Sequence, residues 1–183
     1  NTHYVSAALY KKLPYDSVSD FSPITQVTSA PNIIIVHPSL PAKTVKDLIA
    51  LAKAHPGQIN YASSGNGSTQ HLTGALFCKM AGIDMTHIPY KGSAPALTAM
   101  VSGETQLIFS SMTSTLALVK SNRLRAIAMS SVKRSPLMPT LATVAESGYP
   151  GFEAITWFGL FLPAGAPAAI TTKLNTEFVK VLN

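Results

Sequence analysis

The segment from Ala62 to Leu72 holds the residue types best suited to binding a small anion. Its sequence, ASSGNGSTQHL, is a run of small and hydroxyl-bearing residues between two apolar segments. Apolar spacing predicts a strand before it and a helix after it, with four residues on the helix face that is buried: Leu72, Ala75, Leu76 and Met80. The start of a helix presents unpaired N–H groups and a partial positive charge, which favours a carboxylate ligand.

Two glycines and a predicted helix cap shape this loop. Gly65 and Gly67 can adopt positive φ angles, and neither has a side chain to keep a ligand away from the backbone. Ser68 is placed to cap the helix. The loop lacks the motif G-x-x-x-x-G-K-S/T, and Gln70 stands where G-x-G-x-x-G requires its third glycine, so a phosphate site is not supported. An ordinary strand-to-helix loop with a serine cap is the alternative.

The pattern of a strand followed by small polar residues occurs twice more. Tyr90 to Ser93 follows a predicted strand over Met85 to Ile88, and Ser110 to Ser114 follows one over Gln106 to Phe109. Strands that alternate with helices predict an α/β fold with a mainly parallel sheet. Ligands bind at the carboxyl ends of strands in such sheets, so the three loops are expected to line one crevice.

Further elements are predicted along the rest of the chain. Two strands are expected over Ile24–Val27 and Asn32–Val36, interrupted at Pro31, and a helix follows the capping box Thr44-x-x-Asp47. The later elements expected are a strand over Leu124–Met129, an aromatic-rich strand over Ile155–Leu162, and a helix over Ala168–Leu182 with Ile170, Leu174, Phe178 and Val181 on its buried side.

Three blocks of the sequence resemble the Bug/TctC family of extracytoplasmic solute receptors: YASSGNGSTQHLTG, HIPYKGSAPALTAMVSGETQLIF and PTLATVAESGYPGFEAITWFGLFLPAGAP. The resemblance covers essentially all 183 residues. It implies a periplasmic-binding-protein-like fold with two lobes, a parallel or mixed sheet and helices on both faces. It also implies a periplasmic receptor that binds a small organic anion and delivers it to the membrane subunits of a tripartite tricarboxylate transporter.

The resemblance implies that the chain is a fragment that lacks both ends of a full family member. Residues 1–31 are then a first-lobe and hinge segment, and residues 32–131 form the second lobe with the ligand loops. Residues 132–183 return to the first lobe and end in a truncated helix. The residues that match Asn1 and Thr2 lie on a loop near the ligand in the family.

The resemblance also implies which residues bind the ligand. In the family, the loop that matches Ser63 to Thr69 holds a ligand carboxylate through backbone and hydroxyl groups, and the loop that matches Tyr90 to Ser93 closes on it. The predicted ligand-binding residues are Ser63, Ser64, Gly65, Asn66, Gly67, Ser68, Thr69, Tyr90, Lys91, Gly92, Ser93 and Ser110. Family members often carry an acidic residue near Ser110, which suits amino-acid ligands; its absence here favours a plain mono- or dicarboxylate.

Composition narrows the choice of partners. The chain is 46% hydrophobic, which is enough for a core, and it contains no apolar run that approaches the length of a membrane span. Its formal charge of +6 suits an anionic partner. The basic residues form small scattered clusters without interleaved aromatics, so nucleic acid is not expected as a partner.

The sequence contains few residues in arrangements suited to catalysis or metal binding, and no cofactor is expected. None of the eight acidic residues forms an obvious carboxylate pair, and the five histidines match no metal-binding motif. His71 is a candidate general base, although a histidine in the first turn of a helix more often satisfies backbone groups. Cys78 is interpreted as a small buried hydrophobe, and Trp157 and Phe158 as core or hinge packing rather than ligand stacking.

Two other functions compete with the receptor hypothesis. A cytosolic ligand-sensing domain of a transcriptional regulator shares the same two-lobed α/β plan, and a helix-turn-helix upstream in the gene would favour it. An acyl-transfer or hydrolytic enzyme would use a serine from these loops, but the chain has neither a G-x-S-x-G elbow nor an S-x-x-K pair. The sequence therefore predicts a receptor rather than an enzyme.

Overall fold

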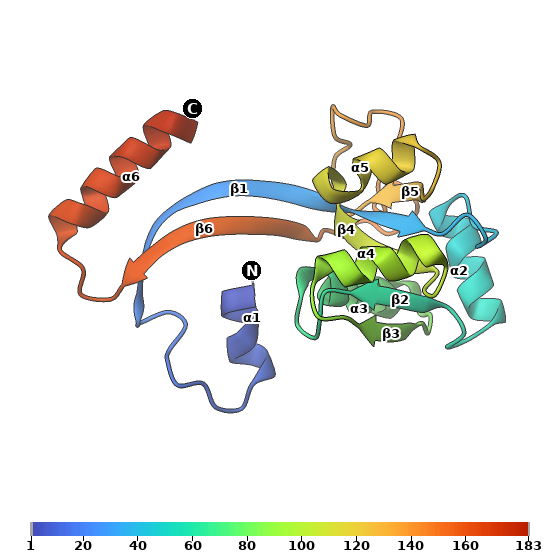
Figure 1. Cartoon of the computed structure of the whole chain (residues 1–183), viewed down its shortest axis with the longest axis horizontal. Helices are drawn as coiled ribbons and strands as arrows, with labels where there is room; N and C mark the ends of the chain where they lie inside the picture. Colours follow the sequence, from blue (N-terminus) through green and yellow to red (C-terminus); the bar gives the residue numbers. More distant parts are fainter. Residues whose placement is uncertain (1, 183) are drawn as a thin grey trace. The chain divides into compact units, whose positions relative to one another are not determined.

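The computed structural model describes residues 2–182, apart from the side chain of Thr2, and shows a mixed α/β fold (Figure 1). The described chain divides into two compact units: residues 2–30 and 156–182 form the first, and residues 31–155 form the second. The elements are α1 (Thr2–Leu9), β1 (Phe21–Val36), α2 (Val45–Ala54), β2 (Asn60–Ser63), α3 (Thr69–Ala81), β3 (Thr86–Pro89), α4 (Ser93–Ser102), β4 (Leu107–Ser111), α5 (Met112–Lys120), β5 (Arg125–Met129), β6 (Ile155–Pro163) and α6 (Ala168–Leu182).

The second unit is built on a mixed sheet. Its strand order is β3-β2-β4-β1-β5, with β6 pairing β1 off this path. Strands β3, β2 and β4 are parallel to one another, whereas β1 is antiparallel to both β4 and β5. The expectation of a mainly parallel sheet is therefore wrong for β1. Alternation with helices specifies where strands occur but leaves open the direction in which the first strand enters the sheet.

Helices cover both faces of this sheet, as the resemblance implies. Consecutive residues of β1 point to opposite faces, so Ile34 and Val36 belong to one core cluster and Ile33 and Ile35 to the other. The first cluster is completed by apolar residues of α2 and α3. The second is completed by residues of α4 together with Met112 of α5.

Strand β1 is one continuous strand of 16 residues, so the predicted break at Pro31 is wrong. Proline lacks a backbone N–H and normally interrupts a ladder. Here the antiparallel registers with β4 and β5 begin at Asn32 and Ile33, one and two residues after the proline. The strand therefore continues because neither of these ladders requires a donor at position 31.

The predicted helix ends are confirmed, but two predicted buried faces are wrong. Thr44 and Asp47 form the complete capping box of α2, Ser68 caps α3, and α3 ends at Gly82 in the left-handed conformation. Helix α3 buries a different set from the one expected: Gln70, Thr73, Gly74, Phe77 and Ala81. Gly74 explains this rotation, because its missing side chain lets the helix lie against the ring of Tyr61.

The first unit contains α1, which the sequence did not predict, and a cluster of aromatic rings. Trp157 lies 5.9 Å from the ring of Tyr4, whereas Phe158 is 62% exposed, so core packing describes only the tryptophan. The predicted buried side of α6 is also wrong, because no residue of α6 is buried and Val181 is 84% exposed. An amphipathic pattern predicts that a helix has an apolar face, and tertiary structure decides whether anything covers that face.

Candidate functional site

The carboxyl ends of three strands meet at one edge of the sheet. Ser63 of β2 is level with Pro89 of β3, and Ala62 is level with Ile108 of β4. Because all three strands are parallel, the segments that follow them leave from the same edge, as predicted. The third segment differs from the expected loop, since β4 runs to Ser111 and α5 begins directly at Met112.

Backbone hydrogen bonds tie the first two loops together. The N–H of Tyr90 donates to the carbonyl oxygen of Ser63 at 2.9 Å, and the N–H of Gly92 donates to that of Ser64 at 3.2 Å. Gly65 has a φ of +130°, and a Cβ on it would lie 3.4 Å from the carbonyl oxygen of Tyr90. A side chain at position 65 would therefore strain the backbone, and its Cβ would contact the neighbouring loop.

The start of α3 offers N–H donors toward this edge. Ser68 has extended backbone angles, and its hydroxyl accepts the N–H of His71 at 3.2 Å. Within the described part of the chain, the backbone N–H groups of Asn66, Thr69 and Gln70 donate to no protein acceptor. With the helix dipole behind them, these three groups are suited to bind an anionic oxygen.

Several side chains of the predicted site hold the loop in shape. Ser63 is fully buried, and its hydroxyl accepts the N–H of Gly65 at 3.1 Å and lies 2.6 Å from Nε2 of His87. The N–H of Ser64 donates to Oε1 of Gln70 at 2.6 Å. The structure thus gives Ser63 a supporting role and leaves Asn66 exposed, with Ser64, Gly65, Ser68 and Thr69 half-buried and Gly67 buried.

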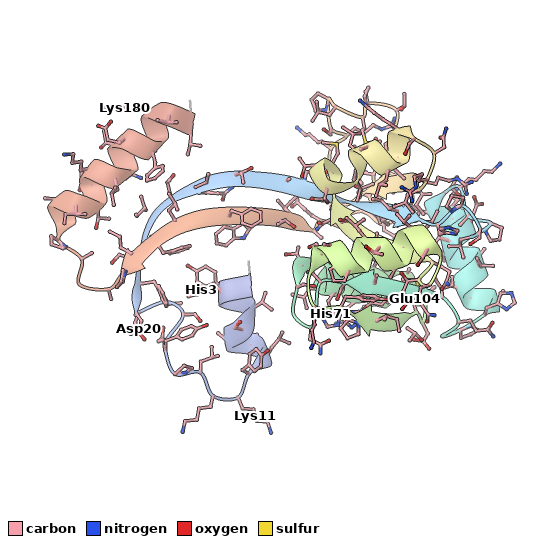
Figure 2. The ribbon with its side chains drawn as sticks, in the orientation of Figure 1. His3, Lys11, Asp20, His71, Glu104 and Lys180 are labelled. Atoms are coloured by element: carbon pink, nitrogen blue, oxygen red, sulfur yellow. The ribbon has the colours of Figure 1, made fainter. Side chains whose placement is uncertain are left out.

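His71 and His87 form a stacked pair behind this loop, and Figure 2 labels His71 near the start of α3. Their ring centroids are 4.0 Å apart with an interplanar angle of 15°, and Tyr61 stacks on His87 at 4.9 Å. Nδ1 of His71 accepts the N–H of Gly67 at 3.1 Å, which supports the interpretation that this histidine satisfies a backbone group. A general base needs a free lone pair on an unprotonated ring nitrogen, and in the neutral ring that nitrogen is Nδ1, which Gly67 already occupies.

Burial disfavours the charged form of both imidazoles. It lowers the pKa of His71, and together with the neighbouring His71 ring it lowers the pKa of His87 to about 4. Burial likewise raises the pKa of Tyr61 to about 12. The support beneath the loop is therefore electrically neutral near pH 7, and the N–H groups at the start of α3 supply the positive potential.

The second loop contributes mainly its backbone at this edge. The hydroxyl of Tyr90 donates to Oε1 of Glu104 at 2.8 Å. Burial is the larger cause and this carboxylate the smaller cause of a Tyr90 pKa raised to about 12. Glu104 precedes β4, so the hydroxyl is directed toward the end of that strand opposite Ser110. Lys91 and Ser93 are exposed, while Gly92 precedes α4 with a φ of +114°.

The third segment combines a buried serine with exposed residues in the first turn of α5. Ser110 is buried, and its hydroxyl lies 3.2 Å from that of Ser114 in the first turn of α5. Asn32 enters the same edge from β1, where it pairs with Ser111, and its side-chain amide donates to Oγ1 of Thr73 at 3.3 Å.

Sequence reasoning missed four supporting residues: Asn32, Gln70, Thr73 and His87. The available signal was the occurrence of an amide, hydroxyl or imidazole beside strand or helix residues that are otherwise apolar. A polar group in such a position needs a partner, and its presence indicates a buried hydrogen-bond network.

Two further features were sought in the described part of the chain: a cluster of metal ligands and a membrane-spanning helix. Among the residues that the structure describes, no three His, Cys, Asp or Glu side chains gather as metal ligands would. None of the described helices combines the length and the apolar character needed to cross a membrane. The resemblance also places two terminal residues, Asn1 and Thr2, near the ligand. Asn1 and the side chain of Thr2 lie outside the described part of the chain.

Comparison with known proteins shows the family to which the chain belongs. The family model of the tripartite tricarboxylate transporter family receptor, TctC, matches residues 1–183. The chain is 34% identical over 179 residues to a protein encoded in the tcbD-tcbE intergenic region of a Pseudomonas species, covering 97% of this chain and 53% of that protein. It is 34% identical over 178 residues to Protein BugT of Bordetella pertussis, covering 97% of this chain and 55% of BugT.

Solved structures of similar proteins have the same fold as this chain. An R. palustris protein with adipate superposes with a TM-score of 0.87 at 38% identity, covering 92% of this chain and 56% of that one. MatC from Rhodopseudomonas palustris with bound malate superposes with a TM-score of 0.88 at 29% identity, covering 99% and 62%. The chain spans about half the length of the curated relatives it matches. It belongs to the tripartite tricarboxylate transporter receptor family, whose members are periplasmic solute-binding receptors rather than enzymes.

Proposed function

We propose that this chain forms the carboxylate-binding part of a periplasmic receptor that binds a small organic anion without transforming it. The receptor then delivers the anion to the membrane subunits of a tripartite tricarboxylate transporter. One observation carries the proposal. In the described part of the chain, the N–H groups of Asn66, Thr69 and Gln70, just before α3 and in its first turn, donate to no protein acceptor, and their loop is joined to the Tyr90–Ser93 loop by two backbone hydrogen bonds. Such a cluster is suited to one carboxylate group.

The same chemistry indicates which anions to test first. Adipate and malate, the ligands of the two structural relatives, are both dicarboxylates. The segment Gln106–Ser110 contains no carboxylate in this chain, so nothing there would pair with the ammonium group of an amino acid. We therefore propose a plain mono- or dicarboxylate as the ligand.

We also propose how the site is completed. The proposed second lobe, residues 32–131, lies within the second unit, residues 31–155, and carries all three strand ends. Residues of the first unit belong to the first lobe and hinge. Lobe closure would then cover the carboxylate that the second lobe holds, as in other hinge-closing binding proteins.

The proposal is tested with the complete gene product that contains this chain. Its melting temperature is measured with adipate, malate, monocarboxylates and amino acids, because a ligand that binds only the folded state stabilises it. We expect a selective rise with one or more mono- or dicarboxylates and none with amino acids. A melting temperature that no carboxylate raises would contradict the proposal.

Two matched glycine variants locate the site. Gly67→Ala places a side chain at a φ of +74° in the loop, and Gly82→Ala does so at a φ of +61° at the other end of α3, where nothing lies within 4 Å. Both variants strain the backbone to a similar extent. We expect only Gly67→Ala to weaken carboxylate affinity, by about tenfold or more, which corresponds to ~1.4 kcal/mol. Equal affinity losses would place the ligand elsewhere.

A third variant tests the role of the tyrosine. Tyr90→Phe removes a hydroxyl that is already bound to Glu104, so we expect carboxylate affinity to change by less than about threefold. A loss of tenfold or more would show that the hydroxyl turns toward the ligand in the bound state.

A further inference from the structure

The stacked histidines support the loop at two separate points. His71, in the first turn of α3, reaches back to the N–H of Gly67. His87, from the neighbouring strand β3, reaches the hydroxyl of Ser63, which in turn accepts the N–H of Gly65. The two rings therefore fix both sides of the turn that contains the glycines, and neither ring needs to contact a ligand to do so.

The hydrogen bonds determine where the protons are. Nδ1 of His71 accepts from Gly67, so it carries no proton and the neutral ring is protonated at Nε2. The Ser63 hydroxyl has one proton, which it donates to the carbonyl oxygen of Gly65 at 3.1 Å, so it accepts from Nε2–H of His87. This arrangement pairs Nδ1 of His71, Nε2 of His87 and the Ser63 hydroxyl while both rings are neutral.

A proton on His71 would break this arrangement. The protonated ring has donors on both nitrogens, so Nδ1 would meet the N–H of Gly67 donor to donor. A proton on each ring would also set two positive charges in face-to-face contact at 4.0 Å. The other titratable group that stacks on the pair is Tyr61, which stays neutral, and the segment from Ser63 to Gln70 contains no charged residue.

We propose that His71 and His87 are positioning residues for the carboxylate loop, and that the turn at Gly67 keeps its shape only while the His71 imidazole is neutral. This inference rests on the proposed function for the role of the loop in binding a carboxylate. The predicted ordering of the loop itself can be measured without a ligand. Acid would therefore disorder the turn around Gly67 and lower the affinity of the loop for a carboxylate. The burial that lowers both imidazole pKa values extends the pH range in which the loop is ordered.

The first experiment needs no ligand. Amide hydrogen exchange and ¹⁵N imidazole spectra of the complete protein are recorded from pH 7.5 to pH 4. We expect the Gly67 protection factor to fall at least tenfold as the His71 ring titrates, with Nδ1 unprotonated at the upper pH. The Leu72 amide, which donates to the carbonyl oxygen of Ser68 at 3.0 Å, serves as the internal control and should keep its protection.

Two substitutions at one position separate the acceptor from the ring. His71→Gln retains a side-chain acceptor three residues after the Ser68 cap but cannot titrate, so Gly67 protection should persist to pH 4. His71→Phe retains a ring to stack on His87 but has no acceptor, so protection should be low at every pH. His87→Gln keeps a donor toward Ser63 and leaves the His71 acceptor in place, so Gly67 protection should still fall as His71 titrates.

The matched control is His55→Gln, because His55 is an exposed histidine that follows α2 and has no part in the loop. It should behave as the unmodified protein. Gly67 protection that stays constant in the unmodified protein down to pH 4, or that survives in His71→Phe, would overturn the inference. Failure of every carboxylate to bind would contradict the proposed function and leave these ligand-free results unaffected, so the two failures are distinguishable.

Discussion

The ring of Tyr61 lies directly against Gly74, so that a Cβ on this glycine would come within 2.5 Å of Cε2 of the tyrosine. Tyr61 is 3% exposed and has its other neighbours in the core and in the stack with His87. Helix α3 can therefore approach β2 closely at position 74, because glycine has no side chain there. This contact sets the depth at which the start of α3 meets the edge of the sheet.

We predict that Gly74→Ala destabilises the protein by about 1–2 kcal/mol. Overpacking a core costs ~1–3 kcal/mol, and the higher helix propensity of alanine returns up to about 1 kcal/mol. Urea unfolding measures the difference. In a Tyr61→Leu background the ring is gone, so the same substitution should be neutral or stabilising, and the double-mutant cycle reports the coupling. A Gly74→Ala protein as stable as the original would show that the contact is not tight.

Ser130 joins three segments that are distant in sequence. Its hydroxyl accepts the buried N–H of Asn32 at 2.8 Å and donates to the carbonyl oxygen of Ala154 at 2.6 Å. Ser130→Ala removes both bonds, and a buried polar group that loses its partner costs about 1–3 kcal/mol. We expect a loss of that size in urea unfolding. Ser131→Ala is the matched control, expected within ~0.5 kcal/mol of the original because its hydrogen bond lies on the surface.

Stability should fall with acid before the carboxylates titrate. The pKa of His87 is about 4 in the folded protein against 6.5 for an ordinary histidine, so between these values the unfolded chain binds more protons. Stability therefore rises with pH across that window and is constant above it with respect to this group. After allowance for solvent screening of a half-buried ring, we expect a change on the order of 1 kcal/mol.

Unfolding measurements at pH 7, 6 and 5 detect this change. His87→Gln should reduce the slope between pH 6.5 and 5, because glutamine does not titrate, and the lowered pKa of His71 should leave a smaller slope. The loss below about pH 4.5 should remain in that variant, since the pKa of Glu146 is lowered by the N–H of Thr143 and by Arg134, which makes acid destabilising there too. A flat profile in the unmodified protein would contradict this assignment to the histidine.

Cys78 should be unreactive in the folded protein. Its side chain packs against the first core cluster, and burial raises the pKa of the thiol to about 11. At pH 8 the thiolate fraction is then smaller than in a free cysteine by a factor on the order of 100. We expect alkylation by iodoacetamide to be slower by at least that factor than in N-acetylcysteine, and to reach the free rate in urea. Rapid alkylation without denaturant would show that the core opens at this position.

The sequence by itself determined the local features of this protein. The capping box of α2, the Ser68 cap and the end of α3 at Gly82 follow from side chains that bond their own backbone or permit a positive φ angle. Such interactions lie within a few residues of each other, so spacing along the chain is enough to predict them. The same holds for the three strand ends, whose common edge follows from repeated strand and helix patterns.

Tertiary structure decided the features that depend on distant segments. The direction of β1, the buried face of α3 and the exposure of α6 each depend on what packs against the element, which its own pattern does not contain. The support of the candidate site is of the same kind. His87 is 24 residues from Ser63 in sequence, yet the parallel register of β2 and β3 sets them 2.6 Å apart, because a hydrogen bond depends on distance in space.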